Sequence, residues 1–294
     1  MTMKKLGFVV MVFAVAALPA LAQQRVDEKR PAGKDGVVEV HNVAGSVRVT
    51  GWDREEVAVT GTLGKGTERL EFSGSGNRTL VKVVLPHFSH HVDGSDLEIK
   101  VPAGSTLDVE TVSADITADG VSGSLELESV SGTVTAGGDP RRFDVKTVSG
   151  DVEVTAANAP GRAKSVSGRV MLKGVAGAVE ASSVSGEVSV TGGSVSTVEL
   201  ETTSGTITLD AGLAKDARVE AKTVSGEVKL VLPSNVGADF EVTTFSGDIT
   251  NDFGQPARRT SEYAPGKELS FSVGGGGARV EAKSFSGNVY LRKR

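Results

Sequence analysis

The chain has 294 residues, with 37 Gly, no Cys and only 4% aromatic residues, and its formal net charge at pH 7 is −5. The lack of Cys excludes disulfide frameworks, cysteine-ligated zinc fingers and thiol catalysis, and the mildly acidic balance disfavours a nucleic-acid binder, which needs a basic face. A hydrophobic content of 38% is too high for a disordered chain. The composition suits many short strands joined by tight turns.

The first 22 residues have the pattern of a secretory signal peptide. Lys4 and Lys5 precede an apolar run over residues 6–18, and Ala20-Leu21-Ala22 offers a cleavage site of the A-x-A type. This run is shorter than the roughly 20 residues that a membrane-spanning helix needs. We therefore expect an exported protein, in the periplasm, on the cell surface or secreted, that begins at Gln23. Loss of two lysines would give it a net charge of −7, and we expect no membrane span in the mature chain.

Residues 23–105 are less regular than the rest of the mature chain. Residues 23–35 are polar and contain Pro31 and Gly33, which predicts a linker. From residue 36 onward, valines alternate with polar residues, as at Val38 and Val40. We interpret residues 36–105 as the irregular first coils of a repetitive domain over residues 36–294, with a loop at residues 64–78.

A Ser/Thr-x-Ser-Gly element recurs nine times over residues 106–294, the regular part of this domain. The spacing is 18 residues for the first five copies, then 19, 21, 21 and 40, and the fourth position is Ala only in the first copy. The last gap has room for an additional degenerate coil around Leu269, Phe271 and Val273. The charged residues 292–294 would then lie on an exposed last coil. The copies begin at Thr111, Ser129, Thr147, Ser165, Ser183, Thr202, Thr223, Thr244 and Ser284.

Apolar and polar residues alternate on both sides of each element. Val152 and Val154 follow Gly150, and Phe143 and Val145 precede that copy. This period of two predicts a half-buried strand on each side, and Ser and Gly suit a sharp corner between the strands. We predict an all-β fold, a single-stranded parallel β-solenoid (β-helix) with about 18–21 residues per coil and two main strands per coil. An up-and-down barrel or sandwich is the alternative, but only stacking brings equivalent positions of a fixed repeat into contact.

An acidic column lies three residues before the start of each repeat. Eight of its nine members are acidic, Arg162 being the exception, and their parity predicts that they point outward. Such a column could bind cations or a basic surface, or it could be a solvated face that keeps the sheet from pairing with other sheets. The acidic residues of this possible interaction stripe are Asp108, Glu126, Asp144, Glu180, Glu199, Glu220, Glu241 and Glu281.

The chain offers few candidates for chemistry. His87, His90, His91 and Asp93 cluster in the sequence, and imidazoles with carboxylates can bind a divalent metal. On a strand, however, His90 would point away from the other two histidines, so a polar surface loop is the alternative. The Ser of the repeat recurs nine times without an adjacent base, unlike a catalytic nucleophile. We predict no catalytic residue, no cofactor and no established metal site.

The repeat resembles the bacterial DUF4097 family, labelled "putative adhesin" and also called the toastrack domain. The resemblance covers residues 36–294. It is carried by Val37-Val38-Glu39-Val40 through Gly51-Trp52-Asp53, the reiterated Ser-Gly-x-Val corners, and the closing Ser286-Gly287-Asn288-Val289-Tyr290-Leu291. The resemblance implies a β-helix outside the cytoplasm with a proposed adhesive or envelope-stress role, and it supplies no catalytic residue.

The sequence favours a non-enzymatic exported β-solenoid that acts as a surface or envelope interaction module. Its expected partner is a cell-envelope or surface component, protein or glycan, rather than nucleic acid. One alternative is an envelope-stress sensor or scaffold that binds a membrane partner. The other is a polysaccharide-acting β-helix enzyme, which would concentrate acidic and basic residues in a cleft formed by long loops.

Overall fold

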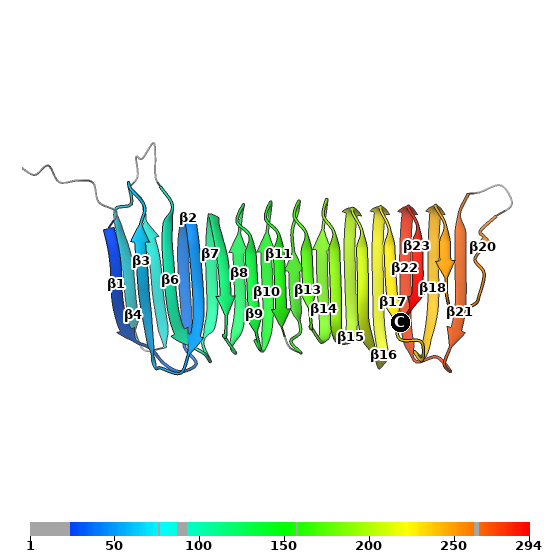
Figure 1. The fold of residues 1–294 in the computed structure, drawn as a ribbon, viewed down its shortest axis with the longest axis horizontal. Helices are drawn as coiled ribbons and strands as arrows, with labels where there is room; N and C mark the ends of the chain where they lie inside the picture. Colours follow the sequence, from blue (N-terminus) through cyan, green and yellow to red (C-terminus); the bar gives the residue numbers. More distant parts are fainter. Residues whose placement is uncertain (1–23, 76, 87–92, 157, 262–264) are drawn as a thin grey trace, which may run out of the picture.

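The computed structural model describes residues 24–294 except 76, 87–92, 157 and 262–264. Over these residues the chain is all-β, and its strands lie side by side in one long, mostly parallel stack (Figure 1). Among the same residues, no helix is long and apolar enough to cross a membrane. The predicted signal peptide and the cleavage point at Gln23 lie outside the described part of the chain.

The central repeats build two parallel ladders. The strand before each Ser/Thr-x-Ser-Gly corner joins the first ladder, and the strand after it joins the second. For example, Val152 pairs with Val134 on one side and Val170 on the other, an offset of one repeat. The central strands are β7 (Thr106–Asp119), β8 (Ser124–Ser129), β9 (Val134–Gly138), β10 (Arg142–Thr147), β11 (Val152–Ala156), β12 (Gly161–Lys164), β13 (Val170–Lys173), β14 (Gly177–Ser183), β15 (Val188–Ser204), β16 (Ile207–Ser225) and β17 (Val228–Leu232). We call the two strands that meet at one corner a layer.

The core is the narrow space between the two ladders. Every second residue of each strand points into it, so that valine and leucine columns stack along the molecule. Val145 and Val152, on the two strands of one layer, are both 0% exposed. The alternation predicted from the sequence is therefore correct for the column of Val152, two residues after the fourth position of each corner. Within this column only Ile249, in the last layer of the second ladder, is partly exposed.

The N-terminal strands close one end of the stack. β2 (Val37–Trp52) pairs parallel with β7 and, on its other side, with β5 and β6. β3 runs antiparallel to β6 and β1, and β4 runs antiparallel to β5. The remaining bounds are β1 (Gln24–Pro31), β3 (Glu56–Leu63), β4 (Arg69–Ser75), β5 (Arg78–Val84) and β6 (Ser95–Pro102).

Two N-terminal predictions need correction. The segment 23–35, predicted to be a linker, contains β1, in which all eight residues pair with β3. The strand has a single inward apolar residue, Val26, and one such residue does not produce a recognisable alternation in the sequence. Backbone hydrogen bonds hold the strand, and its other residues form a charged edge. The predicted loop at 64–78 likewise contains all of β4, whose Phe72 is buried.

The C-terminal layers are stacked out of sequence order. β22 lies between β16 and β18, and β23 lies between β17 and β19. In Figure 1 the red strands accordingly separate the yellow strands from the orange ones. The bounds are β18 (Ala238–Ser246), β19 (Ile249–Asn251), β20 (Arg258–Arg259), β21 (Lys267–Val273), β22 (Ala278–Ser286) and β23 (Val289–Lys293).

This order overturns two expectations. The segment around Leu269, Phe271 and Val273 is not a degenerate coil but strand β21, which runs antiparallel to β18 and covers the end of the first ladder. Residues 292–294 do not lie on an exposed last coil, because β23 lies between β17 and β19. Arg294 pairs with Asp210, two layers away, at 2.8 Å. In this interior position, β22 and β23 of the last repeat have a hydrogen-bonded neighbour on both sides. The end of the first ladder is covered instead by β21, which has no corner.

Candidate interaction surfaces

Each corner is fixed by its first Ser or Thr, which is buried. Ser165 Oγ accepts a hydrogen bond from the N–H of Gly168 at 2.8 Å and donates one to the carbonyl of Gly150, in the preceding layer, at 3.0 Å. The neighbouring corners are so close that a Cβ on Gly168 would lie 1.8 Å from the Gly150 carbonyl oxygen. This hydroxyl thus turns the chain and joins two layers, and six other corners donate to a carbonyl of the neighbouring layer in the same way. All nine serines or threonines are buried, which indicates a structural role.

The second residue of each corner points into solvent and forms an apolar line along one long edge of the molecule. We call this line the corner ridge. Its valines are 37–52% exposed, and Phe285 and Phe245 are 58% and 51% exposed. The two phenylalanine rings stack with centroids 4.9 Å apart. In spatial order the ridge is Val43, Val112, Val130, Val148, Val166, Val184, Thr203, Val224, Phe285 and Phe245.

Sequence reasoning missed the corner ridge. The Ser/Thr-x-Ser-Gly pattern leaves its second position unspecified, although this position is apolar in eight of the nine copies. An apolar residue at an outward corner position is the signal that could have revealed it. Large contiguous apolar surface is uncommon on monomeric soluble proteins and marks interaction sites.

The predicted acidic column lies on the outward side of the first ladder. The register of the strands brings equivalent members together, as where Glu180 pairs with Glu199 and Glu199 with Glu220. From residue 144 onward, neighbouring cations meet many of these carboxylates. Glu180 forms ion pairs with Arg162 at 3.2 Å and Lys164 at 2.5 Å. Glu220 pairs with Lys222, Glu281 with Lys283, and Glu241 with Arg279 at 3.4 Å.

The N-terminal part of the column is different. Burial raises the pKa of the Asp108 carboxyl, and the nearby charges of Glu126, Glu110 and Glu39 raise it further, in that order, against a smaller opposite effect of His41. By contrast, a hydrogen bond from Lys283 lowers the pKa of Glu281. The column therefore combines carboxylates that are paired with lysines and arginines and one crowded acidic region near Asp108. Its role as an interaction stripe stays a prediction.

The predicted metal cluster cannot be assembled from the described part of the chain. His87, His90 and His91 lie outside the described residues, and Asp93 is on the short segment before β6. Among the residues that the structure describes, no group of three or more His, Cys, Asp or Glu side chains could hold a metal ion.

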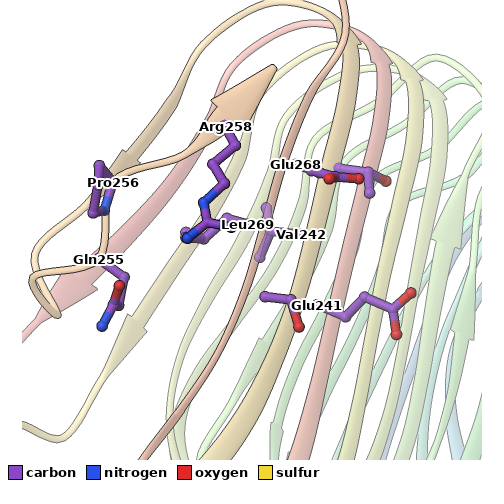
Figure 2. A pocket seen from close by; sticks show the side chains of 9 residues that line it. Glu241, Val242, Gln255, Pro256, Arg258, Glu268 and Leu269 are labelled. Carbon is purple, nitrogen blue, oxygen red and sulfur yellow. The ribbon is translucent and has the colours of Figure 1, made fainter. Parts of the chain in front are cut away.

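A small polar pocket lies at the C-terminal end of the stack. It has a volume of about 300 Å³ and is lined by β18, β20, β21 and the segment between β19 and β20. Figure 2 shows Arg258 extending between Pro256 and Gln255 on one side and the strands that carry Glu241 and Glu268 on the other. One guanidinium and two carboxylates suit a small polar group rather than an apolar ligand.

Comparison with known proteins agrees with the repeat architecture. Residues 161–292 match the family model described as Toastrack DUF4097, which confirms the resemblance seen in the sequence over this part of the chain. A search of curated proteins found no match.

Solved structures with low sequence identity also match most of the chain. A "putative adhesin" from Bacteroides fragilis is 12% identical, with a TM-score of 0.46, over 92% of this chain and 98% of that chain. A "putative lipid binding protein" from Parabacteroides distasonis is 12% identical, with a TM-score of 0.39, over 91% and 96%. A "putative cell adhesion protein" from Clostridium sporogenes is 9% identical, with a TM-score of 0.30, over 92% and 100%.

Proposed function

We propose that this chain is an exported, non-enzymatic β-solenoid that presents its long outer surfaces to a component of the cell envelope or cell surface. The observation that carries the proposal is the persistence of the same outward columns over ten successive layers. A surface that repeats in this way offers equivalent contacts at every layer, which suits an extended partner.

The solenoid assignment is supported by the strand register. Equivalent residues of successive repeats pair in two parallel ladders, and in seven of the nine corners the first hydroxyl donates a hydrogen bond to a backbone carbonyl of the neighbouring layer. The match of residues 161–292 to the Toastrack family supports the same assignment. Export rests on the pattern of residues 1–22, in which two lysines, an apolar run and an A-x-A site follow one another.

The proposed partner contacts the outer faces rather than the end pocket. The pocket has room for about 300 Å³, at the low end of the range for ligand sites. The outer faces carry paired charges along the first ladder, such as Lys146 with Glu128 at 2.6 Å, and apolar side chains along the corner ridge. Mixed polar and apolar contacts of this kind are typical of protein interfaces.

The test uses the mature chain, residues 23–294, immobilised and incubated separately with peptidoglycan, cell-surface polysaccharide and membrane vesicles. We expect saturable retention of one of these materials without its degradation. Turnover of the polysaccharide would replace the proposal with the enzyme hypothesis, and failure to retain any of the three would contradict it.

A charge variant separates the acidic column from the rest of the surface. Glu180, Glu199, Glu220 and Glu241 are replaced together by Gln, which changes the mature net charge from −7 to −3. Because lysines and arginines already neutralise most of these carboxylates, we expect the variant to retain the same material and to be less soluble. Loss of retention would instead assign the binding to the acidic column. Calcium titration by calorimetry of both proteins would detect a cation site.

A further inference from the structure

We propose that the corner ridge is the interface for a second copy of this chain, packed ridge to ridge in the antiparallel direction about a two-fold axis. The axis crosses the stack at right angles, between the layers of Val166 and Val184. Each ridge residue then faces its counterpart counted from the other end, so that Val43 faces Phe245 of the second copy and Val166 faces Val184.

The ridge has the shape for such a contact. The stack is straight (Figure 1), and ten layers at about 4.8 Å give a ridge about 45 Å long. A strip that includes one outward column on each side, two residues before and three residues after the ridge position, covers on the order of 600 Å² per copy. That is somewhat below the roughly 800 Å² per partner of a standard stable interface. We therefore expect a reversible dimer rather than an obligate one.

Charge complementarity identifies the occupant as the chain itself. The first flank column lies one residue before each corner, on the first-ladder side of the ridge. Its members in spatial order are His41, Glu110, Glu128, Lys146, Lys164, Ser182, Glu201, Lys222, Lys283 and Thr243. Glu110 and Glu128 thus lie near one end of the column, and Lys222 and Lys283 lie near the other.

Reversal of this column against itself produces only favourable or neutral pairs. The two-fold axis keeps the first-ladder faces of the two copies on the same side, so the column meets its own reverse. Glu110 then faces Lys283 and Glu128 faces Lys222 of the second copy, while Lys146 faces Glu201. Within one copy, Lys146 already binds Glu128 at 2.6 Å, and Lys222 lies 4.0 Å from Glu201. The dimer would join these two pairs into one four-charge network.

The column on the other side of the ridge also gives only favourable or neutral pairs when it is reversed against itself. It lies three residues after the ridge position, and in spatial order it is Ser46, Asp115, Thr133, Asp151, Arg169, Glu187, Thr206, Glu227, Asn288 and Asp248. Reversed against itself, it places Arg169 opposite Glu187 and brings no two like charges together. Both flanks of the ridge therefore accept the same axis.

Other arrangements of two copies juxtapose like charges, which disfavours them. A shift by one layer in one direction places Lys146 opposite Lys222. The opposite shift places Glu128 opposite Glu201. A parallel dimer would bring the two flank columns together and place Glu110 beside Asp115 and Lys164 beside Arg169. The complementarity also depends on the interior position of β22, because this position puts Lys283 opposite Glu110.

The first test measures self-association of the mature chain by sedimentation velocity over a concentration series at low salt. We expect reversible dimers at about 100 µM, well above a micromolar dissociation constant. Val166→Asp should abolish the dimer, because it places a carboxylate against the apolar Val184 of the second copy on each side of the axis. Thr155→Asp adds the same charge on the outward side of β11 and should dimerise as the parent does. Circular dichroism and thermal melting show that both variants fold.

A charge-swap experiment tests the orientation and register. Glu128→Lys alone and Lys222→Glu alone each place like charges opposite one another twice in the homodimer. Each should raise the dissociation constant by about tenfold or more at low salt. An equimolar mixture of the two variants restores both opposite-charge pairs, so the heterodimer should form with near-parental affinity.

Three results would overturn the proposal. The parent could stay monomeric at about 100 µM, the Val166→Asp variant could dimerise normally, or mixing the charge variants could fail to restore association. Co-sedimentation with anionic vesicles serves as the final arm. A monomeric parent whose vesicle binding is lost in Val166→Asp would assign the ridge to a lipid surface instead. These outcomes do not depend on whether any envelope material is retained.

Discussion

Adjacent residues of this molecule have opposite physical roles. Val152 is 0% exposed, whereas its neighbour Asp151 points outward. The Asp151 carboxylate accepts hydrogen bonds from the Arg169 backbone at 2.8 Å and from its guanidinium at 2.7 Å. These bonds lower the pKa of Asp151. Alternation of residue types was enough to predict which side chains point inward, but not which outward charges would pair.

A charge in the core should be far more harmful than the same charge outside it. Val152→Asp would place a carboxylate between Val134 and Val170, without a partner, in the space between the ladders. We expect a loss of about 4 kcal/mol or more in the free energy of unfolding. Thr155→Asp, which is exposed on the same strand, should change it by less than about 0.5 kcal/mol. Urea denaturation measures both, and equal losses would contradict the assignment of the two faces.

The pH dependence of stability should differ between Asp108 and Asp151. The pKa of Asp108 is raised in the folded state, so its ionised form is disfavoured there and opposes folding at neutral pH. Asp108→Asn should therefore raise the melting temperature at pH 7, with a gain under about 1 kcal/mol. This gain should disappear as the pH falls below the ordinary carboxylate range, because the parent side chain is then protonated in both states.

Asp151 provides the control of opposite sign. Its lowered pKa contributes stability above the unfolded value, and this contribution is lost as the pH falls through the folded value. Asp151→Asn should therefore lower the melting temperature at pH 7 and converge with the parent in acid. Thermal melts between pH 2 and pH 7 would show both trends, and a parallel response of the two variants would contradict the assigned causes.

The corner is the element that turns a repeated sequence into a stack. Its buried hydroxyl satisfies one backbone N–H in its own layer and one carbonyl in the preceding layer, as Ser165 does for Gly168 and Gly150. Each strand pair alone would expose its inner face, so the layers are stable only together. The corners could be located from the sequence because Ser, Gly and their spacing recur. The two hydrogen bonds of the hydroxyl could not be predicted from the sequence, because one of them depends on how close the neighbouring layer lies.

Removal of the hydroxyl at the first position of one corner should lower the free energy of unfolding, whereas removal of the hydroxyl at the third position should not. Ser165→Ala would leave the Gly168 N–H and the Gly150 carbonyl without this partner, at a cost of about 1–3 kcal/mol. Ser165→Thr should be tolerated, because Thr occupies the same position at residue 147. Ser167→Ala, at the exposed third position of the corner, should be nearly neutral. Urea denaturation of the three variants checks the order, and a loss at Ser167 equal to that at Ser165 would contradict it.

The elements that the sequence could not reveal are those without a corner. β1, β4 and β21 close the ends of the stack in antiparallel pairs. β1 has only one inward apolar residue, Val26, and β4 only one fully buried residue, Phe72. A period-two signal needs several inward positions to stand out, so such short end strands resemble loops in the sequence.

At the scale of the whole molecule, the order of the layers could not be predicted from the sequence, and the cause is physical. Every corner offers the same hydroxyl, the same glycine backbone and the same inward apolar residues, so any repeat fits beside any other. Only the connections and the end strands decide which neighbour is chosen. The corner ridge is continuous for the same reason, because it passes through β22 before β18. The repeat alone could have revealed the apolar corner position, but the order of the residues along the ridge required the three-dimensional structure.

The interior position of β22 can be tested with engineered disulfides, because the chain has no Cys of its own. Lys222 pairs with Lys283, which in turn pairs with Thr243, in adjacent strands of the first ladder. Neighbouring strands are about 4.8 Å apart, and strands separated by one other are about 9.6 Å apart. A disulfide requires Cα atoms within about 7 Å. Under mild oxidation, the double variant Lys222→Cys with Lys283→Cys should form an intramolecular disulfide, detected by mass spectrometry and by faster migration on non-reducing gels. The double variant Lys222→Cys with Thr243→Cys should remain reduced as a monomer. If the layers followed the order of the sequence, the second variant would form the bond and the first would not, so the two proteins together decide where the last repeat lies.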